Sequence, residues 1–423
     1  MTWLNLSPLE SVLRGGAVSI HFQPILCLKQ GRVVGLEALA RPEALNISQA
    51  FAEARARGCQ LELDRLCRQR ALDLFAGLEL LGTGLSETSQ PDWRPLLFLN
   101  FEASVLDAGV GGSGAILQAT RAAGLEPRDV VIEINESRVH DDEALIRMVE
   151  QHRAHGFLIA LDDLGAGDSK LARIAQLRPH ILKLDRSLIT GIERDFFKQE
   201  TVKCLTRLGR GIGALVLAEG VETLEEMECC ASLGAELFQG YVLGRPAPPE
   251  LLAIGRSASL LQGVAQRLRE HAVAGLRQRQ VAGRRLEALA QQGGRDLMAR
   301  PPEQFDDVLA TLVEQDSGVE AAYLLDSRGI QVGGTQLGAS GRQVPNRLFA
   351  PSHQGADHST KEYFFSLLDT GLKRYTTDSY ISMATGRLCR TIALLLEHRS
   401  GANYVLCLDI ACGAEGGSAR IRR

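Results

Sequence analysis

Short apolar runs alternate with longer stretches of helical periodicity over the first 245 residues of the chain. A run that is apolar at consecutive positions is typical of a parallel strand buried on both faces. The stretches between the runs, such as 61–78, 143–155 and 196–208, carry apolar residues at the spacing of amphipathic helices. The pattern predicts eight strands, at 19–22, 33–36, 96–99, 130–132, 158–161, 181–182, 214–218 and 237–238.

Eight strands separated by helices predict an α/β fold, the (β/α)₈ barrel, whose site lies at the C-terminal ends of the strands. A polar residue after a single strand would only begin a loop. Here five of the eight strands end in a carboxylate, which favours a shared site at the mouth of the barrel. The residues expected there are Gln23, Glu37, Asn100, Glu133, Asp162, Asp163, Lys183, Asp185, Glu219 and Gln239.

Asp162 and Asp163 are adjacent carboxylates that follow the apolar run 158–161 and precede Gly165. Two neighbouring carboxylates repel each other unless a cation neutralises them, and oxygen ligands suit Mg²⁺ or Mn²⁺. The pair therefore indicates a divalent metal site, although an Asp-Asp pair in a solvated turn stays open on this pattern alone.

The barrel pattern stops near residue 250, and the chain then changes character twice. Residues 251–300 are rich in Leu, Ala, Arg and Gln, with Leu261, Val264 and Leu268 at helical spacing, so we expect a linker of one long helix or two. Its arginines are interspersed with glutamates, which favours a solvated helix face over a nucleic-acid surface. Pro301 begins a smaller unit, 301–412, with strands expected at 321–325, 388–397 and 404–410, and residues 413–423 are expected to form a flexible tail.

Composition narrows the classes of partner. The net charge is -4, so the chain lacks the basic field that binds a nucleic-acid polymer, and any bound nucleotide should be small. No apolar stretch approaches the ~18 residues that cross a bilayer, and the N-terminal residues lack a secretory signal pattern. The nine cysteines form no C-x-x-C pair and are expected to be reduced. We therefore expect a soluble, cytoplasmic protein.

Five segments in order resemble the EAL family of bacterial cyclic-di-GMP phosphodiesterases. They are Glu37-Ala38-Leu39 with Arg41, Asp162-Asp163-Leu164-Gly165-Ala166-Gly167, Lys183-Leu184-Asp185, Glu219-Gly220-Val221-Glu222 and Gln239-Gly240-Tyr241. The resemblance covers about residues 8–250 of the expected barrel domain, residues 1–250. It implies a modified TIM barrel whose first strand runs antiparallel to the others. It also implies hydrolysis of 3′,5′-cyclic diguanylate to linear pGpG.

The resemblance further implies a role for each site residue. Each site would hold two Mg²⁺ or Mn²⁺ ions. The first ion would be bound by Glu37, Asn100, Glu133 and Asp162, and the second by Asp162, Asp163 and Glu219. Lys183, Glu37 and Glu219 would be the catalytic residues. Lys183 would orient the attacking water or accept its proton, unless it only forms a structural salt bridge with Asp185. Arg41 would bind a phosphate. Gln23, Leu39, Asp185 and Gln239 are the other candidates for substrate binding, unless they only cap strands, and Glu136 and Glu222 would stabilise loops.

The chain departs from the family pattern around the central loop. Leu164 stands where a Phe is usual, Asp168 replaces an aromatic residue, and Lys170 replaces a serine. Asn135 replaces the Thr that usually precedes Glu136. Because all six expected metal ligands and Lys183 are present, we favour an active phosphodiesterase. A silent cyclic-di-GMP receptor, or a barrel that acts on another phosphorylated metabolite, stays open.

Residues 301–412 resemble the PAS-like or Cache fold through their order of strands and turns. That resemblance implies an antiparallel sheet and a pocket for an unidentified small ligand, unless the unit serves only to dimerise. Candidate pocket residues are His358, Lys361, Tyr363, Tyr380, Arg387 and Arg390. The family and the long helix together favour a homodimer.

Overall fold

The computed structural model describes residues 7–16, 18–42, 45–78, 94–108, 114–135, 139, 141–166, 171–252, 257–339 and 348–412. The chain forms two compact units, Met1–Ala272 and Val273–Arg423. The boundary falls within one continuous helix, α10 (Ser257–Ala299), where the sequence left open one helix or two. No described helix combines the length and the hydropathy that crossing a membrane requires.

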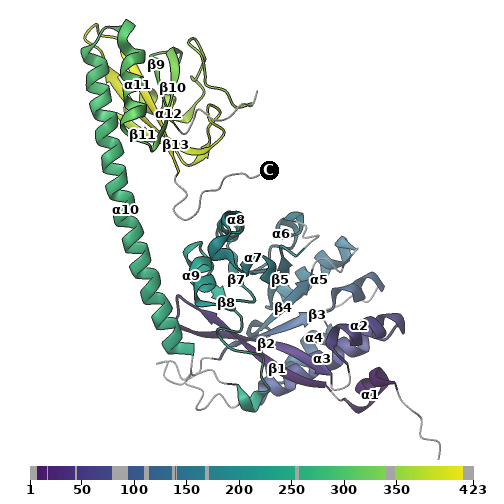
Figure 1. Cartoon of the computed structure of the whole chain (residues 1–423). Helices are drawn as coiled ribbons and strands as arrows, with labels where there is room; N and C mark the ends of the chain where they lie inside the picture. Colours follow the sequence, from purple (N-terminus) through teal and green to yellow (C-terminus); the bar gives the residue numbers. More distant parts are fainter. Residues whose placement is uncertain are drawn as a thin grey trace, which may run out of the picture. The chain divides into compact units, whose positions relative to one another are not determined.

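The first unit is built on a closed barrel of eight strands in sequence order (Figure 1). β1 pairs antiparallel with both β2 and β8, whereas each later neighbour pair is parallel. This arrangement confirms the expected barrel and its antiparallel first strand. The strands are β1 (Val18–Cys27), β2 (Arg32–Pro42), β3 (Leu96–Phe101), β4 (Val130–Asn135), β5 (Leu158–Leu164), β6 (Ile181–Leu184), β7 (Leu215–Ala218) and β8 (Leu237–Phe238).

Amphipathic helices surround these strands, and side-chain caps fix where several of them begin. Asp141 accepts a hydrogen bond from Ala144 N at the start of α5, and Asp195 accepts one from Phe197 N at the start of α8. The helices are α1 (Pro8–Gly15), α2 (Ile47–Ala56), α3 (Gln60–Ala76), α4 (Gly114–Ala122), α5 (Asp142–Ala154), α6 (Leu171–Leu177), α7 (Arg186–Ile189), α8 (Phe196–Ile212) and α9 (Leu224–Ser232). Short 3₁₀ helices lie at Ala103–Ala108, Pro127–Asp129, Ile192–Arg194 and Pro249–Leu251.

An apolar layer fills the interior of the barrel and supports a layer of polar residues, which is described below. The seven strands other than β2 each contribute at least one buried side chain to this cluster, and β2 contributes Gly35, where a Cβ would overlap the ring of Phe98. The glycine is therefore required by the close approach of an aromatic ring. The apolar members are Ile25, Phe98, Val131, Ala160, Ile181, Leu217 and Leu237.

The second unit contains an antiparallel sheet in the order β10-β9-β14-β13-β11, with β12 paired to β13 (Figure 1). One face packs on α10 and α11 (Phe305–Gln315), and the other packs on α12 (Glu362–Thr370). The strands are β9 (Val319–Asp326), β10 (Gln331–Leu337), β11 (Arg374–Thr376), β12 (Tyr380–Ile381), β13 (Leu388–Glu397) and β14 (Asn403–Ala411), and a 3₁₀ helix spans Pro302–Gln304. The expected sheet domain is present, and its assignment as PAS-like or Cache stays a prediction.

Candidate functional site

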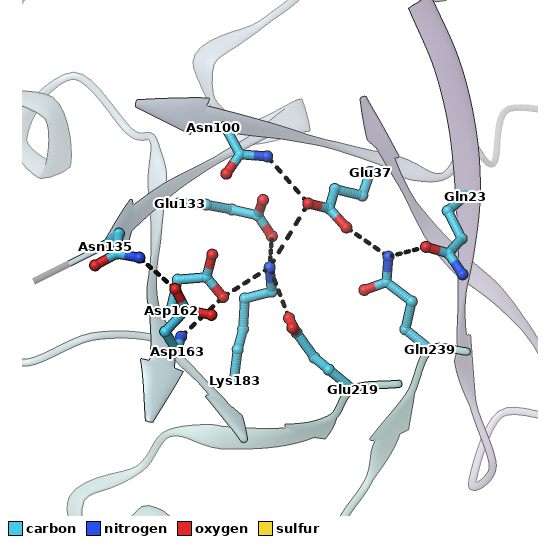
Figure 2. A network of polar contacts seen from close by, with 10 residues as sticks. All are labelled: Gln23, Glu37, Asn100, Glu133, Asn135, Asp162, Asp163, Lys183, Glu219 and Gln239. Atoms are coloured by element: carbon cyan, nitrogen blue, oxygen red, sulfur yellow. Dashed lines mark hydrogen bonds and ion pairs between the residues drawn. The ribbon is translucent and has the colours of Figure 1, made fainter. Parts of the chain in front are cut away.

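All eight strands carry a polar residue two positions from their member of the apolar layer. Side chains alternate between the two faces of a strand, so residues two apart point the same way. Because β1 runs in the opposite direction, its polar residue precedes Ile25, and Gln23 pairs with Glu37 in the β1–β2 register. The polar layer thus consists of Gln23, Glu37, Asn100, Glu133, Asp162, Lys183, Glu219 and Gln239 (Figure 2).

Lys183 lies at the centre of this layer, with its side chain only 1% exposed. Its ammonium contacts four carboxylates that come from four different strands or strand ends (Figure 2). The distances from Nζ are 2.6 Å to Glu133 Oε1, 2.7 Å to Glu219 Oε1, 3.1 Å to Asp162 Oδ1 and 3.8 Å to Glu37 Oε1. Lys183 is therefore held by the site carboxylates, and Asp185 instead caps α7 by accepting a hydrogen bond from Ser187 N.

Burial and mutual repulsion decide the charges in this cluster. Burial raises the pKa of Glu133 well above its ordinary value, and the Glu37 carboxylate adds to the effect against the attraction of Lys183. Burial likewise raises the pKa of Glu219, and Asp162 adds to it. Burial alone would lower the pKa of Lys183, but the four carboxylates outweigh it and hold that pKa well above the usual range. The ammonium is therefore the cation around which the carboxylates gather.

A chain of amides fixes the Glu37 carboxylate. Asn100 Nδ2 donates to Glu37 Oε1 at 3.0 Å, and Gln239 Nε2 donates to Glu37 Oε2. The same Gln239 nitrogen donates to Gln23 Oε1 at 3.1 Å. Burial would raise the pKa of Glu37, but Lys183 and these two amide donors together lower it. Glu37 is thus held as a carboxylate at neutral pH.

The donor set fits a divalent cation. Asp162, Asp163 and Glu219 each offer an oxygen, and these oxygens all lie within 4.8 Å of one another. Glu133 Oε2 is buried and has no hydrogen-bond partner within the part of the chain that the structure describes. Carboxylate and amide oxygens are the ligands of Mg²⁺ and Mn²⁺. A cluster with more carboxylates than cations, one of them with an orphaned oxygen, is suited to bind such ions.

A cavity of about 1180 Å³ opens onto the cluster. Its wall includes Glu37, Asn100, Asp162 and Asp163 at one end, and Leu39 and Arg41 of β2. Residues of α2 and α3, and of the segment after β3, complete it: Phe51, Arg55, Gln60 and Glu102. These four residues could not be predicted from the sequence. Helical spacing indicates which face of a helix is buried, but it does not indicate which residues of that face line a cavity.

Of the two residues expected to stabilise loops, the structure describes Glu222. Glu222 pairs with Arg186, with 2.7 Å between Oε1 and Nη2. Glu136 lies outside the described residues, as do Asp168 and Lys170 of the altered loop. Leu164, by contrast, is described: it is 1% exposed and pairs with Leu184 in the β5–β6 ladder. At this position a leucine fills the core where a phenylalanine is usual.

Four of the six candidate pocket residues of the second unit make hydrogen bonds or ion pairs with buried side chains. His358 Nδ1 lies 3.1 Å from the Tyr363 hydroxyl, which accepts a hydrogen bond from the Tyr323 hydroxyl. Tyr380 donates to the buried Asp409, and Arg387 pairs with the buried Glu320 at 3.0 Å. Lys361 precedes α12 and Arg390 lies in β13. A cavity of about 460 Å³ in this unit is lined by other residues, among them Gln291, Arg295, Lys373 and Leu394.

Glu133→Gln is expected to stabilise the metal-free chain more strongly as the pH rises. The folded state raises the pKa of Glu133, so wild type loses stability once the unfolded chain ionises near its ordinary value of 4.5. The glutamine stays neutral, so the difference in the free energy of unfolding should grow by up to about 1.4 kcal/mol per pH unit. Urea unfolding of both proteins in chelator at pH 5, 6, 7 and 8 measures this difference. A difference that shrinks with pH would contradict the direction of the shift.

The comparisons with known proteins point to one family. The model of the EAL domain matches residues 8–246. The bifunctional diguanylate cyclase/cyclic di-GMP phosphodiesterase MucR of Pseudomonas aeruginosa is 31% identical over 258 residues, which are 58% of this chain and 36% of MucR. The EAL-domain containing protein YkuI of Bacillus subtilis is 25% identical over 407 residues, 93% of this chain and 95% of YkuI. The chain thus spans about a third of the length of MucR and nearly all of YkuI.

Solved structures agree on the fold. The crystal structure of YkuI in complex with c-di-GMP and calcium has a TM-score of 0.76 and 23% identity, and the match covers 96% of this chain and 99% of that one. The structure of the PaMucR phosphodiesterase in complex with c-di-GMP has a TM-score of 0.50 and 28% identity, with 57% and 96% covered. The likeness to YkuI extends over both units.

Proposed function

The chain belongs to the EAL domain family through residues 8–246, and we propose on this basis that it hydrolyses cyclic-di-GMP to linear pGpG. One observation carries the proposal: the six residues expected as family ligands lie together with Lys183 in one cluster, and Glu37, Asn100, Asp162 and Asp163 of this cluster line a cavity. The names of the relatives support the activity, since MucR is described as a cyclic di-GMP phosphodiesterase.

Two divalent cations, Mg²⁺ or Mn²⁺, are part of the proposal. Bound there, such ions supply the positive charge that acidifies a water molecule and neutralises the phosphodiester. The first would be held by Glu37, Asn100, Glu133 and Asp162, and the second by Asp162, Asp163 and Glu219.

Within this proposal the protein's own groups bind and orient the substrate. Lys183 would orient the attacking water or accept its proton; in the metal-free chain the surrounding carboxylates raise its pKa against the effect of burial. Arg41 lies in the cavity wall, where its planar guanidinium can bind a phosphate. Gln239 donates a hydrogen bond to Glu37, and Gln23 accepts one from Gln239, so both amides lie beside the Glu37 carboxylate.

Incubation of the purified chain with cyclic-di-GMP and Mg²⁺ or Mn²⁺, followed by chromatography, tests the proposal. pGpG should form with wild type and not with Asp162→Ala, which removes the carboxylate shared by both proposed cation sites. If no product forms but calorimetry detects binding of cyclic-di-GMP, the chain would be a receptor. The altered loop keeps this alternative open. No binding at all would favour another phosphorylated substrate.

Three further expectations stay predictions of the sequence. They are a homodimer, a cytoplasmic location and a small ligand of the second unit. Light scattering of the purified chain tests the first of them, and a monomer would contradict it.

A further inference from the structure

Asp162 and Asp163 both face the site although they are neighbours on one strand. Consecutive residues of a regular strand point to opposite faces, so one of the two carboxylates should point away. The β5–β6 register shifts between Leu161 and Leu164, and Asp163 has φ 59°, in the left-handed region. An irregularity of this kind re-aims side chains, and aspartate tolerates the left-handed region better than most residues do. The break in the ladder is what brings the second carboxylate into the site.

Asp163 leaves the regular ladder, and contacts with described neighbours help to hold it there. The Asp163 backbone N–H donates to Asp162 Oδ1 at 3.0 Å. Asn135, at the end of β4 and in register with Asp162, donates from Nδ2 to Asp163 Oδ2 (Figure 2). Asn135 also lines the cavity beside the two aspartates. Its amide therefore reaches the carboxylate that the register shift brings into the site.

We propose that Asn135 is a positioning residue that holds the Asp163 carboxylate in the group formed with Asp162 and Glu219. The inference rests on the proposed function, because it concerns the cation that these three carboxylates would bind. The departure from the usual Thr then has a physical meaning: the longer asparagine side chain carries an NH₂ donor to the carboxylate. Groups that orient metal ligands typically change metal affinity about 10- to 100-fold when removed.

Asn135→Leu tests the inference, because leucine has nearly the same size and no amide. Calorimetric titration with Mn²⁺, without substrate, should show the affinity of one of two binding events reduced about 10-fold or more. The other event should be little changed, because the ligands proposed for the first cation do not include Asp163. Asn135→Thr, which restores a short hydroxyl donor, should recover part of the affinity.

Asp195→Ala is the matched control. Asp195 accepts hydrogen bonds from Phe197 N and Lys198 N at the start of α8, so its loss should lower the thermal midpoint without altering Mn²⁺ affinity. Wild-type Mn²⁺ binding by Asn135→Leu would overturn the inference, and so would equal weakening in Asp195→Ala. A wild type that binds no Mn²⁺ would overturn it as well. A wild type that binds two Mn²⁺ and makes no pGpG would refute the proposed activity alone, since the Mn²⁺ titration does not depend on turnover.

Discussion

Lys183→Met is expected to reduce kcat for cyclic-di-GMP about 10²- to 10³-fold, with substrate affinity changed much less. A fixed positive group beside developing negative charge in a buried site contributes about this much to catalysis. Methionine keeps most of the volume of the lysine and removes only its charge. Single-turnover kinetics, together with calorimetric binding in the presence of Ca²⁺, separate the two effects. Unchanged kcat would remove Lys183 from the mechanism.

The same substitution should make the stability of the protein dependent on metal. Without the ammonium, four carboxylates lose their buried counter-charge, and breaking such a pairing costs about 3–5 kcal/mol of unfolding free energy. Saturating Mn²⁺ should restore much of this loss, because a ligand that binds only the folded state stabilises it. Thermal unfolding with chelator and with Mn²⁺ measures both.

The control for this experiment is Lys29→Met. Lys29 pairs with Glu236 at 3.5 Å, but its side chain is 74% exposed. Exposed ion pairs contribute little to stability, so in both conditions the midpoint of Lys29→Met should match that of wild type. A metal response of equal size in Lys29→Met and Lys183→Met would contradict the role given to the buried ammonium.

Much of the barrel could be predicted from the sequence, because a strand buried on both faces leaves a plain apolar run. The polar residue after each run was also visible, and the structure joins eight of them into one layer. Strand direction was not visible, because a run such as 19–22 reads the same whether it pairs parallel or antiparallel. The family resemblance supplied the direction of β1, and the structure confirms it.

Other parts of the molecule left no readable signal. In the second unit, β11 and β12 are only three and two residues long, and β10 contains Gly333 and Gly334, so neither length nor β-propensity marks them. The inward turn of Asp163 depends on a register shift between two strands, which one strand's sequence does not contain. The cavity wall from α2 and α3 depends on how the helices pack on the barrel.

In this unit the barrel fold determines where the charged residues of the polar layer lie. Each strand delivers its polar residue only because an apolar side chain two positions away fixes which face is interior. The cost of gathering four carboxylates is offset by the ammonium of Lys183 and by the neutral amides of Asn100 and Gln239. The barrel therefore holds together, before any cation binds, the ligands that a cation would need.

Glu37→Ala is expected to abolish detectable turnover and leave the barrel folded. Removing a proposed ligand costs several kcal/mol of charge stabilisation, a loss on the order of 10³-fold or more in rate. The fold should survive, because Lys183 keeps three carboxylate partners and the apolar layer beneath is untouched. Chromatographic assay of pGpG, with circular dichroism and thermal unfolding, measures both expectations.

Glu37→Gln separates the charge of this residue from its contacts. The glutamine can still accept a hydrogen bond from Asn100 or Gln239 but carries no charge, so we expect it to be as inactive as alanine. Glu236→Ala is the matched control: Glu236 lies before β8, at the other end from Gln239, and accepts a hydrogen bond from Val216 N. It should lose stability and keep its activity. An active Glu37→Gln beside an inactive Glu37→Ala would mean that Glu37 serves to position Asn100 and Gln239, and the metal assignment would be wrong.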